Sequence, residues 1–346
     1  MESSTLGPGP EPRNLLEARS TPESRGLERD EVRLLVSAGS RHEHGSFREL
    51  ADILWAGDVL VVNRSATLAA SLEAKGSPGE FMLNLSTRYG TGLWLAEPRW
   101  SAGRPGPLPL ATGERIMVAG SAATILAPYP GIPRLRFVAF AEDPFSLMSR
   151  HGRPVRYGYL AANTNLADYQ TIFGDRPGSA EMPSAARPFT VRVLESLERA
   201  GIELVSLTLH TGVSSLESGD LHAGELYPEP FELTAGAAAH LNDATRLGRR
   251  IIAVGTTVVR ALASAWDGRA FRAARGMTRV YVRPGRQLPP LAGMLTGFHE
   301  PEATHLAMLE AIAGREQVAA GYRQAREAGY LWHEFGDVHL LLGRAS

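Results

Sequence analysis

The chain has 346 residues, of which 44% are hydrophobic and 21% charged, and a formal net charge of −1, a balance typical of one large or two ordinary folded domains. It contains no cysteine, which excludes disulfides, thiolate metal sites and cysteine nucleophiles. No apolar run approaches the roughly 18 residues of a membrane span, and the polar N-terminus lacks a signal-peptide core, so we expect a cytoplasmic protein without a membrane partner.

The N-terminal part of the chain is predicted to hold a flexible tail and the first elements of an α/β domain. Residues 1–24 are rich in Pro, Gly, Ser and charged residues, a composition that favours a mobile segment. After the tail, an apolar run predicts a strand at 32–39, helical spacing of apolar residues predicts a short helix at 47–54, and a second apolar run predicts a buried strand at 59–62.

Residues 71–153 have a different character and are predicted to form an inserted all-β domain. No convincing helix occurs there, and short alternating runs are separated by Gly- and Pro-rich turns, which is typical of a small antiparallel barrel. The loop at 101–109 should be exposed. We therefore divide the chain into three parts. Residues 1–24 form a flexible tail, residues 25–70 together with 154–346 form the α/β domain, and residues 71–153 form the inserted all-β domain.

After residue 154, apolar runs alternate with amphipathic segments. This alternation predicts a mixed, largely parallel sheet flanked by helices, and the ligands of such sheets bind beyond the carboxyl ends of the strands. The expected helices are 190–201, 235–248, 303–314 and 316–329, and the expected strands are 202–210, 251–254, 279–285 and 337–342.

The stretch 249–262, RRIIAVGTTVVRAL, predicts a buried strand, a turn at Gly255 and a helix capped by Thr256 and Thr257. The free N–H groups of such a helix start bind carboxylates and phosphates. Arg260, one turn further on, is placed to close on the same anion with its planar fork. An ordinary strand-to-helix joint with two capping threonines accounts equally well for this pattern.

Titratable side chains also follow or precede predicted strands. His210 and His299 each follow an apolar run, where a histidine is well placed for acid–base chemistry near neutral pH, although each taken singly also fits a structural role. Asp337 is either a turn former or a carboxylate facing the same crevice as the histidines. Glu229, in a proline-flanked loop, either holds a cationic amine or is a solvated charge. We expect His210, His299 and Thr256 to meet at the carboxyl edge of the sheet.

Other kinds of site are not indicated. The sequence has no Walker loop, no G-x-S-x-G elbow and no H-E-x-x-H motif. His42 and His44 lie beside Glu43, but nothing nearby completes a metal site, so we expect this pair on an exposed strand edge.

Several short sequence motifs between about residues 32 and 342 occur in the same order as in a known family. In their order and their residues they resemble the motifs of the S-adenosylmethionine:tRNA ribosyltransferase-isomerases of queuosine biosynthesis. The block at 294–314, MLTGFHEPEATHLAMLEAIAG, resembles L-L-T-N-F-H-L-P-x-S-T-L-L-M-L-x-x-A-x-A-G, and the block at 329–342, GYLWHEFGDVHLLL, resembles Y-R-F-x-S-[YF]-G-D-A-M-L-I. The other matching blocks are GDVLVVN (57–63), YQT (169–171), LTLHTG (207–212) and GTTVVRAL (255–262).

The resemblance implies a mixed α/β domain interrupted by a small β-barrel, which agrees with the division made above. It also implies transfer of the ribosyl part of S-adenosylmethionine onto the aminomethyl group of a 7-deazaguanine base in tRNA. Adenine and methionine leave, and the sugar is isomerised to give epoxyqueuosine-tRNA. S-adenosylmethionine is then a substrate, and no metal or other cofactor is required.

On this resemblance, His299 is the leading acid or base, His210 is the second, and Asp337 is a further catalytic candidate. Glu229 or Asp337 would meet the methionine ammonium or the attacking amine. The residues expected to hold an anion, either the methionine carboxylate or a tRNA phosphate, are Thr256, Thr257 and Arg260. The remaining residues expected to bind substrate are Tyr169, Gln170 and Phe298.

The chain departs from the family inside its motifs. PSAARPFT (183–190) stands where the family has P-T-A-G-L-H-F-T, so Arg187 and Pro188 replace leucine and histidine. NRSATLAAS (63–71) stands where the family has N-[ND]-T-[RK]-V-x-P-A-R, which removes both basic positions and weakens phosphate contacts. Two alternatives therefore stay open: a related enzyme that cleaves S-adenosylmethionine but uses another acceptor, and a non-catalytic binding homologue. We expect a monomer.

Overall fold

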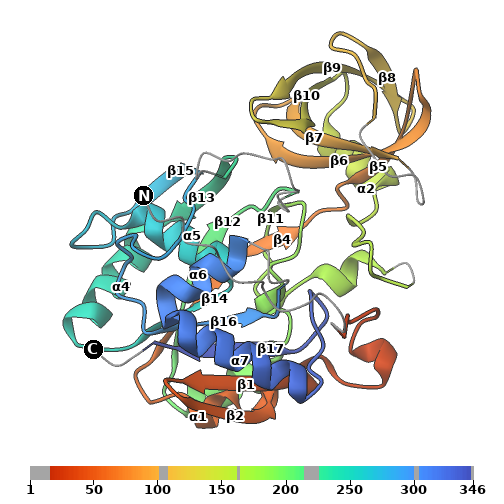
Figure 1. Cartoon of the computed structure of the whole chain (residues 1–346). Coiled ribbons are helices and arrows are strands. Elements are labelled where there is room, and N and C mark those ends of the chain that lie inside the picture. The colour runs from red at the N-terminus through yellow and green to blue at the C-terminus, as the bar shows by residue number, and fades with distance from the viewer. Residues whose placement is uncertain (1–15, 101–107, 162–163, 214–225, 300–303, 344–346) are drawn as a thin grey trace, which may run out of the picture.

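The computed structural model describes residues 16–100, 108–161, 164–213, 226–299 and 304–343, and it joins an α/β body to a closed β-barrel (Figure 1). The mixed α/β fold with an inserted small antiparallel barrel, expected from the sequence, is confirmed. No helix of the described residues is long and apolar enough to cross a membrane.

The body is built on a nine-stranded mixed sheet. In spatial order the strands are β15 (Ala274–Thr278), β13 (Glu229–Leu233), β12 (Glu203–Leu209), β3 (Val59–Asn63), β14 (Ile251–Val254), β16 (Gly293–Gly297), β17 (Val338–Leu342), β1 (Arg33–Ala38) and β2 (Arg41–Ser46). The strands from β12 to β16 pair in parallel, as do β17 and β1, and the remaining neighbours pair antiparallel.

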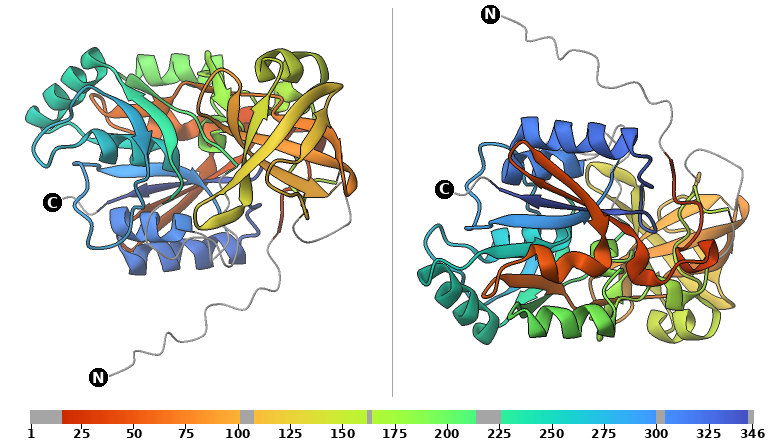
Figure 2. Two further views of the ribbon diagram at one scale, coloured as in Figure 1. Left: turned by 90° about the horizontal axis from the view of Figure 1, so that it is seen from above. Right: turned by 90° about the horizontal axis from the view of Figure 1, so that it is seen from below.

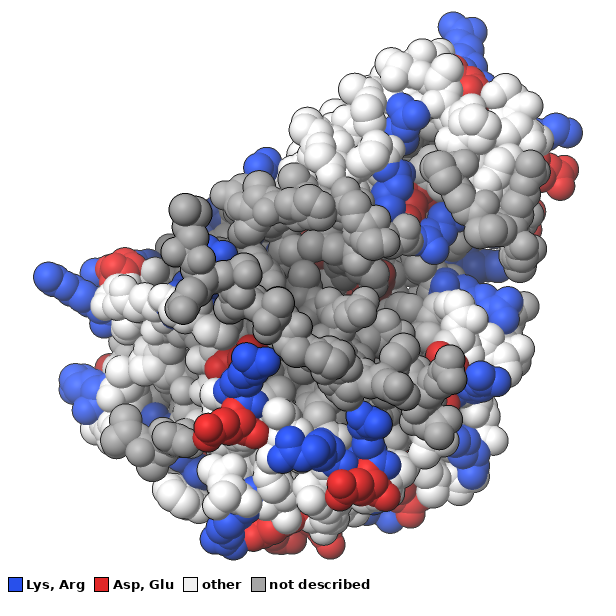
Figure 3. Space-filling view, viewed as in Figure 1, with Lys and Arg blue, Asp and Glu red and all other residues white. Residues whose placement is uncertain are grey.

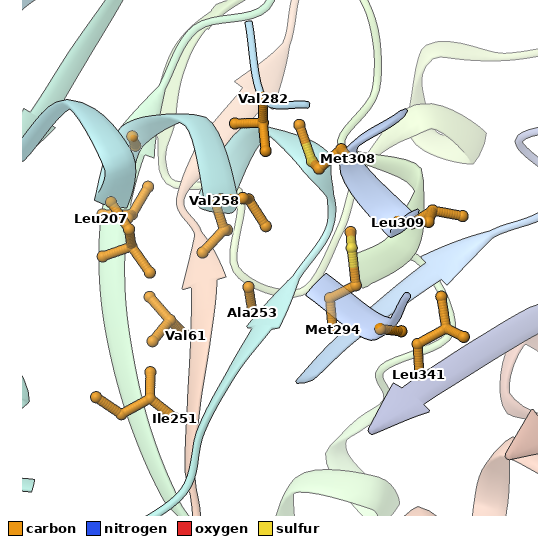
Figure 4. Close-up of a cluster of buried hydrophobic side chains, with 14 of the residues drawn as sticks. Val61, Leu207, Ile251, Ala253, Val258, Val282, Met294, Met308, Leu309 and Leu341 are labelled. Carbon is orange, nitrogen blue, oxygen red and sulfur yellow. The ribbon is translucent and has the colours of Figure 1, made fainter. Parts of the chain in front are cut away.

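The central strands are apolar on both faces because helices cover both sides of the sheet (Figure 2). The helices are α1 (Leu50–Ile53), α3 (Val191–Arg199), α4 (Ala235–Arg246), α5 (Thr256–Ala265), α6 (Thr304–Ala313) and α7 (Arg315–Glu327). Ile251 and Ala253 of β14 pack into the core beneath α4 to α7, part of which Figure 4 shows. The alternate residues, Ile252 and Val254, pack beneath α1 and α3 on the other face of the sheet.

The inserted part closes into a six-stranded barrel. Alternate residues of its strands, such as Leu83 and Leu85 of β6, are fully buried in a separate core. The strands are β5 (Ser71–Gly76), β6 (Gly79–Arg88), β7 (Leu93–Trp100), β8 (Arg115–Val118), β9 (Ser121–Tyr129) and β10 (Ile132–Phe140). A short parallel pair, β4 (Ser65–Thr67) and β11 (Arg176–Ser179), lies between the barrel and the body (Figure 1).

Two secondary-structure expectations are wrong in the barrel region and after β15. Helix α2 (Pro144–His151) occurs in the stretch where no helix was expected; Asp143 caps it, and it buries Leu147 and Met148 against the barrel core. Residues 279–285 are not a strand; β15 ends at Thr278, whose hydroxyl accepts a hydrogen bond from the N–H of Val280 (3.2 Å) and turns the chain.

Several smaller expectations concern the ends and edges. Strand β2 lies at the sheet edge with His42 and His44, as predicted. Residues 16–24, assigned to the tail, pack against the body, where the N–H of Ala18 donates to the carbonyl of Trp332 (3.1 Å). The rest of the predicted tail and most of the predicted exposed loop, residues 1–15 and 101–107, lie outside the described residues.

Candidate active site

A small cavity lies at the carboxyl ends of β14 and β16. Strand β17 runs antiparallel to β16, so the loop before β17 reaches the same edge of the sheet. The cavity has a volume of about 70 Å³, which is room for several water molecules or a group of amino-acid size. Its described lining includes Tyr157, Glu181, Met182, Thr211, Gly255, Thr256, Thr257, Thr296, His299, His305 and Glu334.

One wall of the cavity is the start of α5. Gly255 precedes the helix with a φ of +91°, a conformation that favours glycine. The prediction that Thr256 and Thr257 cap this helix is wrong, because the N-cap is Gly255 and, among the described residues, no capping side-chain hydrogen bond is made. Thr257 instead accepts a hydrogen bond from the amide of Asn63 (3.2 Å). The N–H groups at the start of α5 thus have no capping side chain among the described residues, and such groups attract anions.

His299 lies in the cavity just beyond β16. Its Nε2 is 3.3 Å from the hydroxyl of Thr296, and its backbone N–H donates to the Tyr322 hydroxyl (3.3 Å). Its ring centroid is 4.2 Å from that of His305, the second residue of α6. Burial, aided by His305 and His333, holds the pKa of His299 well below its ordinary value. The imidazole is thus neutral at physiological pH and able to accept a proton.

His210 is not brought to this cavity. Its Nδ1 lies 2.7 Å from the hydroxyl of Ser65, and burial lowers its pKa. Gly178 allows this packing, since a Cβ there would lie 2.4 Å from the same nitrogen. The neighbouring Thr211 does line the cavity; it is 7% exposed, and its hydroxyl has no partner within the part of the chain that the structure describes.

Arg260 and Glu229 bind each other. The Arg260 Nη1 donates to the Glu229 carboxylate, and its Nε donates to the carbonyl of Val280 (3.2 Å). The second Glu229 oxygen accepts from the N–H of Gly212 (2.9 Å). Glu229 begins β13 and is 1% exposed, so the loop expected around it is wrong. Two of the three guanidinium nitrogens of Arg260 are thus bound within the chain, whereas Nη2 is buried and has no hydrogen-bond partner among the described residues.

Asp337 and Phe298 occupy scaffold positions outside the cavity lining. The two Asp337 oxygens accept from the backbone N–H groups of Arg33 and Leu331, both at 2.8 Å, and burial raises the pKa of this carboxyl. Phe298 is fully buried and stacks on His339, with centroids 5.2 Å apart. Asp337 thus anchors a loop to the backbone, and Phe298 is a residue of the hydrophobic core.

Tyr169 and Gln170 line a second, larger space, a groove of about 1340 Å³ between the barrel and the body. Gln170 is held there by the backbone of Thr67, to which its side-chain amide donates (2.8 Å) and from which it accepts (3.2 Å). Figure 3 shows positively charged side chains where the barrel, at upper right, meets the body. The basic residues lining the groove are Arg99, Arg153 and Arg156.

Sequence reasoning missed several cavity residues. His305 and Glu334 stand where the two family patterns quoted above read leucine and serine, and a titratable side chain at such a position is a signal that could have identified them. Burial raises the pKa of Glu334 to about 7. No group of three metal-ligating side chains occurs among the residues that the structure describes.

Arg187, one of the departures from the family motif, has a structural partner. It is 2% exposed and donates to both carboxylate oxygens of Glu23 (3.0 and 2.9 Å) and to the carbonyl of Asp168 (2.9 Å). Its guanidinium lies 4.9 Å from the ring centroid of Phe335. The substitution therefore anchors the segment around Glu23 to the body.

Comparison with known proteins gives consistent matches along the chain. A family model described as "Queuosine biosynthesis protein" matches residues 14–341. A Thermus thermophilus protein named S-adenosylmethionine:tRNA ribosyltransferase-isomerase is 35% identical over 331 residues, which cover 91% of this chain and 93% of that one. A protein of the same name from Desulfitobacterium hafniense is 32% identical, covering 91% and 94%. The crystal structure of the S-adenosylmethionine tRNA ribosyltransferase from Thermotoga maritima matches 95% of this chain and 98% of its own, with a TM-score of 0.53 and 24% identity, and so supports the fold.

Proposed function

Since this chain belongs to the queuosine biosynthesis protein family that includes the S-adenosylmethionine:tRNA ribosyltransferase-isomerases, we propose that it catalyses their reaction. It transfers and isomerises the ribosyl moiety of S-adenosylmethionine onto the aminomethyl-7-deazaguanine base of tRNA, giving epoxyqueuosine-tRNA, adenine and methionine. The observation that supports this proposal most is that the structure has two separate spaces. One is a small cavity that contains His299, and the other is a large groove that is lined by arginines.

S-adenosylmethionine binds with its amino-acid end in the small cavity. The carboxylate lies at the start of α5, where free N–H groups and the hydroxyls of Thr256 and Thr257 attract an anion. The hydroxyl of Thr211, which has no partner among the described residues, is available to the same carboxylate. The volume of about 70 Å³ is too small for the whole molecule, so the adenosyl part extends out of the cavity.

His299 supplies the acid–base chemistry. The sulfonium acidifies the adjacent C5′ protons, and a neutral imidazole at this place can remove one of them. The proton that it then carries is available to the departing adenine. Groups that transfer protons in this way contribute about 10²–10⁴-fold to the rate.

The tRNA lies in the groove between barrel and body. Arg99, Arg153 and Arg156 line it and suit contacts to the phosphate backbone. Cavity and groove belong to one chain, so a monomer in the cytoplasm is sufficient for the reaction.

A second candidate is a related enzyme that cleaves S-adenosylmethionine but uses a different acceptor. Ala66 and Ser71 favour it, because both line the groove at the two positions that are basic in the family pattern. Ser71 pairs with Arg153 across an isolated β-bridge, so Arg153 stands beside one of the lost basic positions and favours tRNA instead.

The test is to incubate the purified protein with S-adenosylmethionine, with and without tRNA that carries the aminomethyl-deazaguanine base. Adenine, methionine and the RNA mass are followed by mass spectrometry. Adenine release that requires this tRNA, with a matching gain in RNA mass, supports the main proposal. Adenine release without it supports the second candidate, and binding without any turnover supports a non-catalytic homologue.

A further inference from the structure

The cavity that holds His299 is lined by groups that attract charges of both signs. Its described lining includes the carboxyl groups of Glu181 and Glu334 and contains no lysine or arginine. The start of α5 lines the same cavity through Gly255, Thr256 and Thr257, and the N–H groups at a helix start attract negative charge. The lining therefore offers partners to a ligand that carries both an anion and a cation.

Glu334 is held in place by an unusual turn. The preceding residue, His333, has a φ of +73°, a conformation that is uncommon outside glycine and is often found near functional sites. The N–H of His333 donates to the carbonyl of Phe298 (3.1 Å), and its carbonyl accepts from the N–H of Gly336 (3.0 Å). The hydroxyl of Tyr159 donates to the Glu334 carboxylate. The carboxyl group at the cavity wall is thus fixed from both the backbone and the side chain.

Aromatic rings stand beside this carboxyl. Tyr157 lines the cavity and stacks on Tyr159 with centroids 5.7 Å apart, and Tyr159 stacks on His333 at 4.5 Å. Tyrosine faces attract cations. The 93% buried Thr211, whose hydroxyl has no partner in the described part of the chain, lines the same cavity. An unpaired buried hydroxyl is costly unless a ligand satisfies it, so it points independently to a bound molecule.

Resting on the proposed function, we propose that Glu334, together with Tyr157 and Glu181, forms the subsite that recognises the positively charged sulfonium of S-adenosylmethionine. The carboxylate of the same molecule then lies at the start of α5. After the reaction the sulfur belongs to methionine and is a neutral thioether. Glu334 therefore favours the substrate over the sulfur-containing product and assists product release.

The electrostatics of Glu334 add a measurable consequence. Burial raises the pKa of Glu334 to about 7, so the carboxyl of the empty cavity is partly protonated at neutral pH. A bound cation favours the ionised form, so binding releases a proton and becomes tighter as the pH rises through 7. Among the described residues, the other titratable groups that line the cavity are Tyr157, Glu181, His299 and His305. Tyr159 donates to the Glu334 carboxylate, and His333 stacks on Tyr159.

The experiment compares S-adenosylmethionine with S-adenosylhomocysteine, which keeps the ammonium, carboxylate and nucleoside but lacks the sulfonium charge. Dissociation constants are measured by calorimetry at pH 6 to 8 for the unmodified protein, for Glu334→Gln, and for Glu198→Gln on the surface of α3 as a control. We expect Glu334→Gln to weaken S-adenosylmethionine about tenfold, to leave S-adenosylhomocysteine within about twofold, and to abolish the pH dependence.

The outcomes separate this inference from the proposed function. If the unmodified protein binds no S-adenosylmethionine, the proposed function fails. If it binds S-adenosylmethionine but Glu334→Gln weakens both ligands equally, or neither, Glu334 does not read the sulfonium and only this inference is overturned. Glu198→Gln should behave as the unmodified protein does for both ligands.

Discussion

The imidazole rings of His299 and His305 lie with their centroids 4.2 Å apart and their planes tilted by 37°. One ring follows the end of β16 and the other belongs to the first turn of α6. Burial lowers the pKa of both rings, that of His305 to about 4. A proton on either ring opposes a proton on its neighbour, so the pair stays neutral at physiological pH and can take up one proton from a substrate.

Replacing His299 tests this assignment directly. His299→Asn keeps a polar side chain but cannot transfer a proton, so we expect kcat to fall about 10²–10⁴-fold while the fold is retained. Adenine release is the readout, and unchanged circular dichroism and thermal unfolding confirm the fold. His240→Asn, on the surface of α4 beside Glu203, is the matched control. Turnover close to normal in His299→Asn would remove this residue from the catalytic groups.

Replacing His305 should change the pH dependence rather than abolish activity. Burial is the main cause of the low pKa of His299, and His305 lowers it further. In His305→Asn the second cause is lost, so the pKa of His299 rises. A base acts only when deprotonated, so the acidic limb of the profile of kcat/KM should move to higher pH. An unchanged acidic limb would show that the two rings do not titrate together.

The buried pair of Arg260 and Glu229 should matter for stability. Their side chains are 8% and 1% exposed, and Glu229→Gln leaves the guanidinium charge buried without its counter-ion. We expect the free energy of unfolding in urea to fall by about 3–5 kcal/mol. The double variant Arg260→Met with Glu229→Leu removes both charges and should cost less. Asp243→Asn, in an exposed pair with Arg246, should have little effect; an equally small effect of Glu229→Gln would contradict the prediction.

Replacing Asp337 tests whether its carboxylate has a structural or a catalytic role. Each oxygen accepts from one backbone N–H, and an asparagine can satisfy only one of them. We therefore expect Asp337→Asn to lower the free energy of unfolding by about 1–3 kcal/mol and to leave kcat of the folded protein near normal. Stability is measured in urea, and activity well below the unfolding temperature. A large loss of kcat at unchanged stability would return Asp337 to the catalytic list.

Local patterns predicted the layers of the fold because each of them is decided by neighbouring residues. The uninterrupted apolar run of β14 follows from burial on both faces, and the helix start after Gly255 follows from the turn that glycine allows. The same reasoning placed His299 and Thr256 together correctly in one cavity. It did not separate Phe298 from His299, although adjacent residues past a strand point in different directions, and Phe298 enters the core.

Local sequence patterns do not predict contacts between segments that are distant in the chain. The Arg260–Glu229 pair joins a helix to a strand 31 residues earlier, and neither spacing nor composition indicates that the two side chains face each other. The family pattern points to Asp337, which matches it, and gives no indication of Glu334, which departs from it. Which of the two carboxyl groups lines the cavity depends on the turn at His333, which no local rule predicts.

The groove makes the last prediction, which concerns the acceptor. Arg153 and Arg156 are exposed on its wall, and the exposed Glu73 pairs with Arg153 at 3.0 Å. If tRNA binds there, Arg153→Ala and Arg156→Ala should each weaken tRNA binding and reduce the slope of log affinity against log salt by about one. Glu73→Gln removes a negative charge from the same wall and should strengthen binding. The affinity for S-adenosylmethionine should not change in any of the three. Arg246→Ala on α4 is the control, since it removes the same charge far from the groove. An equal effect of Arg246→Ala would show that the groove arginines act only through the overall surface charge. If none of the variants changes tRNA binding, an acceptor other than tRNA is favoured.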